Sequence, residues 1–160
     1  MVVWILCAIF AGLITYTLYR RDRMKVSTAI AIPVFVCYIA FVLTITILER
    51  TPGREMRYNL ELFWTVRAII DGRRALIIEI FWNIVLFVPI GLTVVVILRR
   101  HPMVSVMVGA LLSTGIEVAQ LLTHRGLFEF DDILYNTMGA AIGLLIYLLV
   151  RKQENVSSFV

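Results

Sequence analysis

Five long apolar runs constrain this chain more than any other feature of its sequence. They extend approximately over residues 2–19, 27–48, 75–98, 103–122 and 133–150. An α-helix needs about 20 residues to cross roughly 30 Å of hydrocarbon, so each run is long enough to span a membrane. Because lipid offers no partner to a free backbone N–H or C=O group, a spanning run must be helical. The sequence therefore predicts an all-α, polytopic membrane helix bundle with about five transmembrane helices.

The composition supports a membrane protein. Of 160 residues, 61% are hydrophobic and 16% are charged, and the mean hydropathy is +0.92. A soluble domain is nearer half apolar. The net charge of +4 comes from Lys and Arg residues that border the apolar runs, which is typical of membrane loops and not of a nucleic-acid-binding face. The length allows one bundle, so we predict a single membrane domain over residues 1–160.

The first apolar run predicts an uncleaved membrane anchor. It has no basic stretch before it and no small-x-small cleavage pattern, so it does not resemble a signal peptide. Four basic residues follow it at once, Arg20, Arg21, Arg23 and Lys25. Such clusters stay on the cytoplasmic side of a membrane. We therefore expect the N-terminus outside the cell and the C-terminus in the cytoplasm.

Residues 55–74 are too polar to span the membrane. Apolar residues such as Leu60, Trp64 and Ile70 alternate with charged residues in a pattern compatible with an interfacial amphipathic helix on the outer side. We expect this segment to cover the outer ends of the spans. Its basic and aromatic residues suit anionic headgroups or phosphates. Anchoring by side chains that snorkel to the interface is the alternative.

Three spans carry paired polar residues at similar depth. The members of each pair are three or four residues apart, so each pair lies on one helix face. Ionisable groups at membrane depth are costly, and they usually face the protein interior or take part in function. At 1.5 Å of rise per residue, all of these side chains fall near the outer ends of their helices. They predict one polar pocket, open to the outer surface, with the members Glu79, Asn83, Glu117, Gln120, Asp132 and Asn136.

Structural roles are the alternative for several of these residues. Amide side chains in membrane spans often form hydrogen bonds between helices, and Glu79 has two arginines nearby as ion-pair partners. One of the adjacent residues Asp131 and Asp132 is expected to cap a helix. The other has two open alternatives, an ion pair with Arg125 or a bound cation. No tight metal-ligand spacing occurs in the sequence, so we predict neither a metal nor a cofactor.

Residues 125–139, RGLFEFDDILYNTMG, resemble the signature of the VanZ-like family of membrane proteins. Three further motifs occur in the order of that family: Tyr58-Asn59-Leu60 with Phe63, the motif from Asn83 to Gly91, and Glu117-x-x-Gln120. The resemblance covers roughly residues 58–147. One departure is Leu62, which stands where the family usually has proline before the aromatic residue.

The resemblance implies a protein of the bacterial cell membrane that is linked to reduced susceptibility to lipoglycopeptide antibiotics such as teicoplanin. It implies no defined chemistry. It assigns importance to the motif residues Asn59, Asn83, Glu117, Gln120, Arg125, Asp131, Asp132 and Asn136. The expected pocket fits an amphiphile at the outer leaflet, such as a lipid-linked peptidoglycan precursor or the acyl tail of the antibiotic.

Three functions stay open on the sequence alone, and binding is favoured. The first is a non-enzymatic protein that binds such an amphiphile among the membrane lipids. The second is an intramembrane enzyme acting on a cell-envelope lipid, with Glu117 or Asp132 as general base and Arg125 holding a phosphate or carboxylate. The third is a small lipid transporter whose carboxylates carry protons. The sequence has no Ser-His-Asp arrangement, Gly-rich phosphate loop or zinc spacing, so an enzyme is less favoured.

Overall fold

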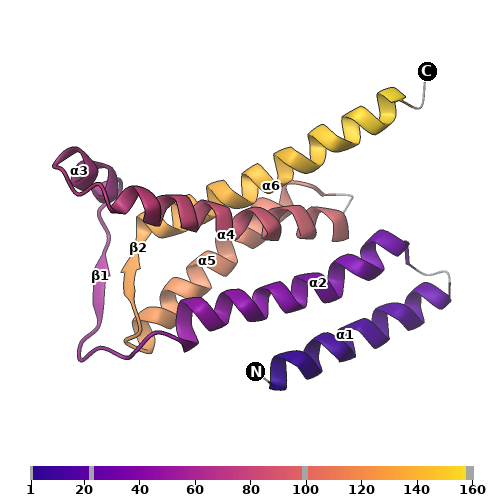
Figure 1. Cartoon of the computed structure of the whole chain (residues 1–160), viewed down its shortest axis with the longest axis horizontal. Coiled ribbons are helices and arrows are strands. Elements are labelled where there is room, and N and C mark those ends of the chain that lie inside the picture. The colour runs from indigo at the N-terminus through magenta and orange to yellow at the C-terminus, as the bar shows by residue number, and fades with distance from the viewer. Residues whose placement is uncertain (1, 22–23, 99–100, 158–160) are drawn as a thin grey trace.

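The computed structural model describes residues 2–21, 24–98 and 101–157, and within them the chain is a membrane helix bundle (Figure 1). Helices that are long and apolar enough to cross a membrane cover Val26–Leu48, Leu76–Ile97, Val104–Leu122 and Phe130–Gln153. A further apolar helix, α1 (Val2–Arg20), precedes them. The expected all-α bundle of a multi-pass membrane protein is confirmed. Arg23, used above to predict the orientation, lies outside the described residues.

The helices run back and forth along the long axis of the molecule (Figure 1). Helix α2 (Val26–Leu43) continues into the π-helical turn η1 (Thr44–Leu48) and is followed by α4 (Leu76–Ile97), α5 (Val104–Leu122) and α6 (Phe130–Ser157). The core lies where α2, α4 and α5 meet, around Val42, Phe87, Ile90, Val94 and Ile116. Helix α1 packs along α2 at the side of this bundle. Exposed apolar side chains on the outer helix faces suit contact with lipid.

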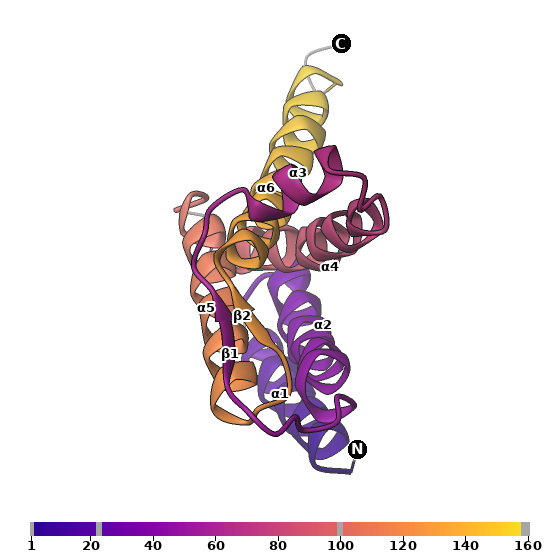
Figure 2. The ribbon, with the colours of Figure 1, turned by 90° about the vertical axis from the view of Figure 1, so that its left-hand side faces the viewer.

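Three short elements gather at one end of the bundle, which we call the strand end. Strand β1 (Arg57–Asn59) pairs in parallel with β2 (Leu127–Glu129), with Tyr58 opposite Phe128. The helix α3 (Trp64–Ile70) follows β1. Figure 2 shows the two strands side by side in front of the helices. Two loops at this end of the bundle are thereby joined by backbone hydrogen bonds across about 70 residues of sequence.

The segment 55–74 differs from the amphipathic helix that its sequence predicts. Only Trp64–Ile70 is helical, because Arg57–Asn59 is drawn into the two-stranded sheet instead. Phe63 has φ of 61°, and this left-handed residue turns the chain into α3. Within α3, Thr65 and Ala68 are buried against the bundle, whereas Val66 and Ile70 are exposed. The helix is shorter than expected but keeps one apolar face turned away from the protein.

Helices α4 and α6 approach each other closely at three glycines. A Cβ atom at Gly91 would collide with the backbone of Ala140, and one at Gly139 or Gly143 would collide with the α4 backbone. Close approach at small residues is how membrane helices gain packing contacts without a hydrophobic driving force. The contact fixes the side-by-side placement of α4 and α6 along most of their length.

Replacing Gly139 by alanine is expected to separate α4 from α6. The new Cβ would overlap the carbonyl of Ile84, so the cost is about 1–3 kcal/mol, as for other overpacked interiors. A thermal unfolding assay in detergent measures this as a lower midpoint. Gly115→Ala is the control, because no atom lies within 4 Å of a Cβ at that position. Equal midpoints for the two variants would contradict the close contact.

Candidate functional site

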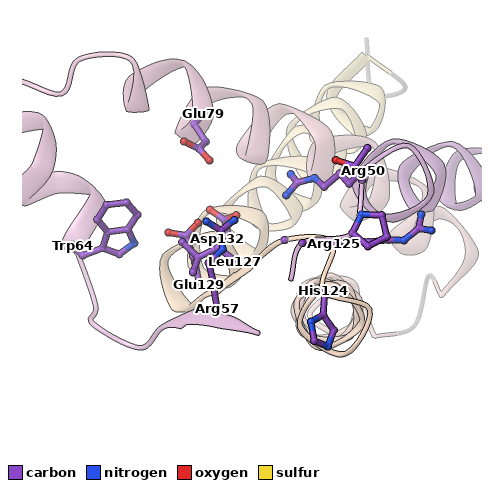
Figure 3. Close-up of a pocket in the computed structure, with 13 residues that line it drawn as sticks. Arg50, Arg57, Trp64, Glu79, His124, Arg125, Leu127, Glu129 and Asp132 are labelled. Atoms are coloured by element: carbon purple, nitrogen blue, oxygen red, sulfur yellow. The ribbon is translucent and has the colours of Figure 1, made fainter. Parts of the chain in front are cut away.

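A cavity of about 630 Å³ opens at the strand end of the bundle. Its wall comes from the loop after η1, both strands, the first turns of α3, α4 and α6, and the loop between α5 and β2 (Figure 3). The lining includes the acids Glu79, Glu129 and Asp132 and the basic or aromatic residues Arg50, Arg57, Trp64, His124 and Arg125. We call this the strand-end cavity. It combines side chains of both charges at the end of a membrane bundle.

The nine residues singled out from the sequence divide into two groups. Three of them, Glu79, Arg125 and Asp132, line the strand-end cavity. The other six do not line the cavity, and each bonds to a neighbouring residue or segment. These six are Asn59, Asn83, Glu117, Gln120, Asp131 and Asn136.

Asp132 is positioned by Asn83. The Asn83 Nδ2 group of α4 donates a hydrogen bond of 2.7 Å to Asp132 Oδ1 in the first turn of α6. Both side chains are half-buried. Because the amide donor comes from the neighbouring helix, Asp132 is held at the cavity wall with one carboxylate oxygen left for other contacts.

Glu117 joins α5 to β2. Its side chain is only 2% exposed, and its Oε2 accepts a 2.9 Å hydrogen bond from the backbone N–H of Glu129. The residue does not line the cavity. Its direct role is therefore to fix β2, and with it the Glu129 side chain, over the end of α5.

Gln120 and Arg125 both bind the end of the second span. Gln120 Nε2 donates to the carbonyl of Thr46 at 3.0 Å, and Arg125 Nη1 donates to the carbonyls of Ile47 and Leu48 at 3.1 and 2.8 Å. The last carbonyls of a helix lack internal partners, and a basic side chain suits their negative dipole end. Although Arg125 lines the cavity, its guanidinium is engaged at the end of η1. Among the described residues it forms no ion pair with Asp131 or Asp132.

Asp131 caps α3 and not its own helix. The side chain is fully buried, and its two oxygens accept hydrogen bonds from the backbone N–H groups of Phe63 at 2.6 Å and Thr65 at 2.9 Å. The Thr65 hydroxyl donates a third bond of 2.7 Å. A carboxylate in this position satisfies free amides and suits the positive end of the helix dipole. The cap places Trp64, which lies between the two amides, in the cavity wall.

The remaining two residues make local or interhelical bonds. Asn59 Oδ1 accepts a 3.0 Å bond from the backbone N–H of Glu61 and closes the turn after β1. Asn136 Nδ2 donates to Ser113 Oγ at 2.8 Å between α6 and α5, and both residues are buried. Asn136 therefore matches the alternative of an interhelical hydrogen bond more closely than a pocket-lining role.

The structure adds cavity residues that the sequence did not single out, and Glu129 is the most buried of them at 7% exposed. Burial, with a smaller contribution from the nearby charges of Asp132 and Glu79, raises the pKa of the Glu129 carboxyl to about 7, and the Trp64 indole partly offsets these effects. Alternation in β2 was an available signal, because Leu127 and Glu129 share one face of the strand and both line the cavity. Arg50 had no such signal, since it lies in an irregular loop.

The cavity can bind a polar head that offers both donors and an anion. Carboxylates only accept hydrogen bonds unless they are protonated, whereas arginines only donate them. Among residues 2–21, 24–98 and 101–157, no three His, Cys, Asp or Glu side chains converge closely enough to hold a metal ion. The donors and acceptors of the cavity suit recognition of a charged organic group, and its carboxylates can accept a proton.

Glu129→Gln is expected to change how stability depends on pH. A carboxyl with an ordinary pKa of 4.5 in the unfolded chain and about 7 in the folded one binds more protons when folded. The free energy of unfolding of the wild type should therefore fall as pH rises from about 4.5 to 7, by roughly 1–3 kcal/mol. The glutamine variant should lose this slope in thermal unfolding scans. An unchanged slope would contradict the buried carboxyl.

Asp131→Ala is expected to loosen α3. The change removes the acceptor of three hydrogen bonds, at a cost of about 1–3 kcal/mol for the amides left buried. Hydrogen exchange of residues 63–70 should rise more than exchange elsewhere in the chain. Asp71→Ala, an exposed aspartate at the other end of α3, should leave that exchange unchanged.

Comparison with protein families gives one match. The model of the VanZ/LLP1 family matches residues 34–151. Curated proteins and solved structures give no match. The matched range contains every residue that lines the strand-end cavity.

Proposed function

Because the chain belongs to the VanZ/LLP1 family, we propose that it is a bacterial cell-membrane protein that binds an amphiphile of the outer leaflet in the strand-end cavity. The location of that cavity is the observation that carries the proposal. It lies at the end of a bundle of membrane-spanning helices, so a molecule bound there has its head among polar side chains and its apolar part in lipid.

The predicted orientation puts the strand end outside the cell. Helices α2 and α4 border the loop that holds β1 and α3, and α5 and α6 border β2. The end of α1 and the start of α2, which border the basic residues Arg20 and Lys25, lie at the opposite end of the bundle, where the positive-inside rule expects the cytoplasm. With this orientation the cavity faces the outer leaflet, where cell-wall precursors and lipoglycopeptides are present.

Binding there would lower susceptibility to lipoglycopeptides such as teicoplanin. An occupied cavity holds a lipid-linked cell-wall precursor or the acyl tail of the antibiotic beside the protein, and in either case the antibiotic reaches fewer free targets. The exposed apolar face of α3, with Val66 and Ile70, lies beside the cavity and gives an acyl chain a surface to contact.

The cavity also favours one residue for an intramembrane enzyme, which is the second candidate function. Asp132 lines the cavity and has one oxygen held by Asn83, so its other oxygen can take a proton from a bound substrate. Glu117, the other general base considered, lies outside the cavity with one oxygen bound to a backbone amide. A covalently changed ligand after incubation with the protein would favour this candidate over binding.

Arg50→Ala is expected to weaken binding of teicoplanin or of a lipid-linked precursor to the purified protein in nanodiscs. Loss of one charged hydrogen-bond donor costs about 1.5–3 kcal/mol, which is roughly a 10- to 100-fold rise in Kd. Antibiotic tolerance of a susceptible bacterial host that expresses the protein should fall in parallel. Arg67→Ala is the control, since Arg67 is exposed and pairs with Glu61 outside the cavity. Equal Kd values for the two variants would refute the cavity as the binding site.

A further inference from the structure

Opposite charges face each other across the strand-end cavity without pairing. Arg50 lies on the side of η1, and Glu79 lies on the α4 side, with Asp132 and Glu129 between them and Trp64 (Figure 3). Within the described part of the chain, the salt bridge joins Arg67 to Glu61, and neither residue lines the cavity. Arg50, Arg57 and three carboxylates around one space can therefore still bind a ligand that carries both a positive and a negative charge.

The arrangement selects one kind of polar head. A purely anionic head would meet Arg50 and Arg57 but would leave Glu79, Glu129 and Asp132 without a cation. A head that carries an ammonium beside a phosphate can bind the carboxylates and Arg50 at the same time. An ammonium has three N–H donors and a positive charge for the carboxylates, and a guanidinium binds phosphate through two parallel hydrogen bonds.

The cavity lies between the end of the second span and the start of α4. Helices α2 and α4 are joined deeper in the bundle, where the Tyr38 hydroxyl donates a 2.8 Å bond to the Leu86 carbonyl and Val42 packs on Phe87. At the strand end, Arg50 and Glu79 line opposite sides of the cavity instead. The cavity thus separates the end of η1 from the start of α4.

The start of α4 is apolar and uncovered on most of its circumference. Positions 77–79, 81 and 82 are exposed and Ile80 is half-buried, and at about 100° per residue the exposed positions spread over more than half of the helix surface. Apart from Glu79, the exposed side chains there are Ile77, Ile78, Phe81 and Trp82. Acyl chains can therefore remain in the bilayer against these residues while the head enters beside Glu79.

We infer that the strand-end cavity takes the head of an aminophospholipid, which enters sideways from the leaflet between the ends of η1 and α4. The ammonium lies against the carboxylates of Glu79, Asp132 and Glu129, and the phosphate lies on Arg50. This inference rests on the proposed function and narrows its ligand to an ammonium-and-phosphate head.

Native mass spectrometry of the delipidated protein tests the inference. The protein is offered phosphatidylethanolamine, phosphatidylglycerol and phosphatidylcholine in equal amounts, with identical acyl chains. Phosphatidylethanolamine should be retained at least about fivefold over the other two, because phosphatidylglycerol lacks the cation and phosphatidylcholine lacks the N–H donors. Glu79→Gln and Arg50→Gln should each bring the three lipids to nearly equal retention. Glu61→Gln and Arg67→Gln make the same chemical changes at an exposed ion pair outside the cavity and should keep the preference.

Each contrary outcome has a distinct meaning. Equal retention of the three lipids by the wild type, which needs no variant to fold, overturns the aminophospholipid inference while amphiphile binding stands. Retention of no lipid, together with no binding of teicoplanin or precursor, overturns the proposed function as well. Free phosphoethanolamine should displace the lipid only at far higher concentration than a lysophosphatidylethanolamine. Equal potency of the two competitors overturns the sideways entry of a lipid.

Discussion

The close contact between α4 and α6 determines the position of almost every other feature at the strand end. Because Gly91, Gly139 and Gly143 leave no room for a side chain, the two helix backbones approach directly. The first turn of α6, which lies between Gly139 and the strand end, then bonds to two different partners. Asp132 receives the amide of Asn83 from α4, and Asp131 caps α3. One helix contact thus positions both a wall of the cavity and the short helix α3.

The carboxylates at this end of the molecule divide into two roles. Asp131 and Glu117 accept hydrogen bonds from backbone amides, so their charge is used to hold α3 and β2 in place. Glu79, Asp132 and Glu129 face the cavity instead. A carboxylate bound to backbone amides is already satisfied, whereas one that faces an open space retains unfilled acceptor sites. This difference, and not the presence of an acid at membrane depth, separates structural from candidate binding residues.

The sequence predicted the spans and the depth of the polar residues, but not the partners of those residues. Hydropathy and helical rise depend only on local sequence, so the apolar helices and the position of Glu79 and Asp132 in the first turns of α4 and α6 follow directly. The partners of Gln120 and Arg125 are backbone carbonyls of η1. Every residue has such a carbonyl, so no residue type in the sequence marks these as the acceptors. The parallel pairing of two three-residue strands from distant segments likewise leaves no periodic pattern long enough to detect.

The residues matched by the family and the residues that line the cavity both exclude α1. The matched residues 34–151 begin within α2, and the cavity lining lies entirely inside them, from Arg50 to Asp132. Helix α1 packs on α2 and contributes no cavity residue. The residues of the proposed binding site therefore lie within the matched unit, whereas α1 supports that unit from outside by packing on α2.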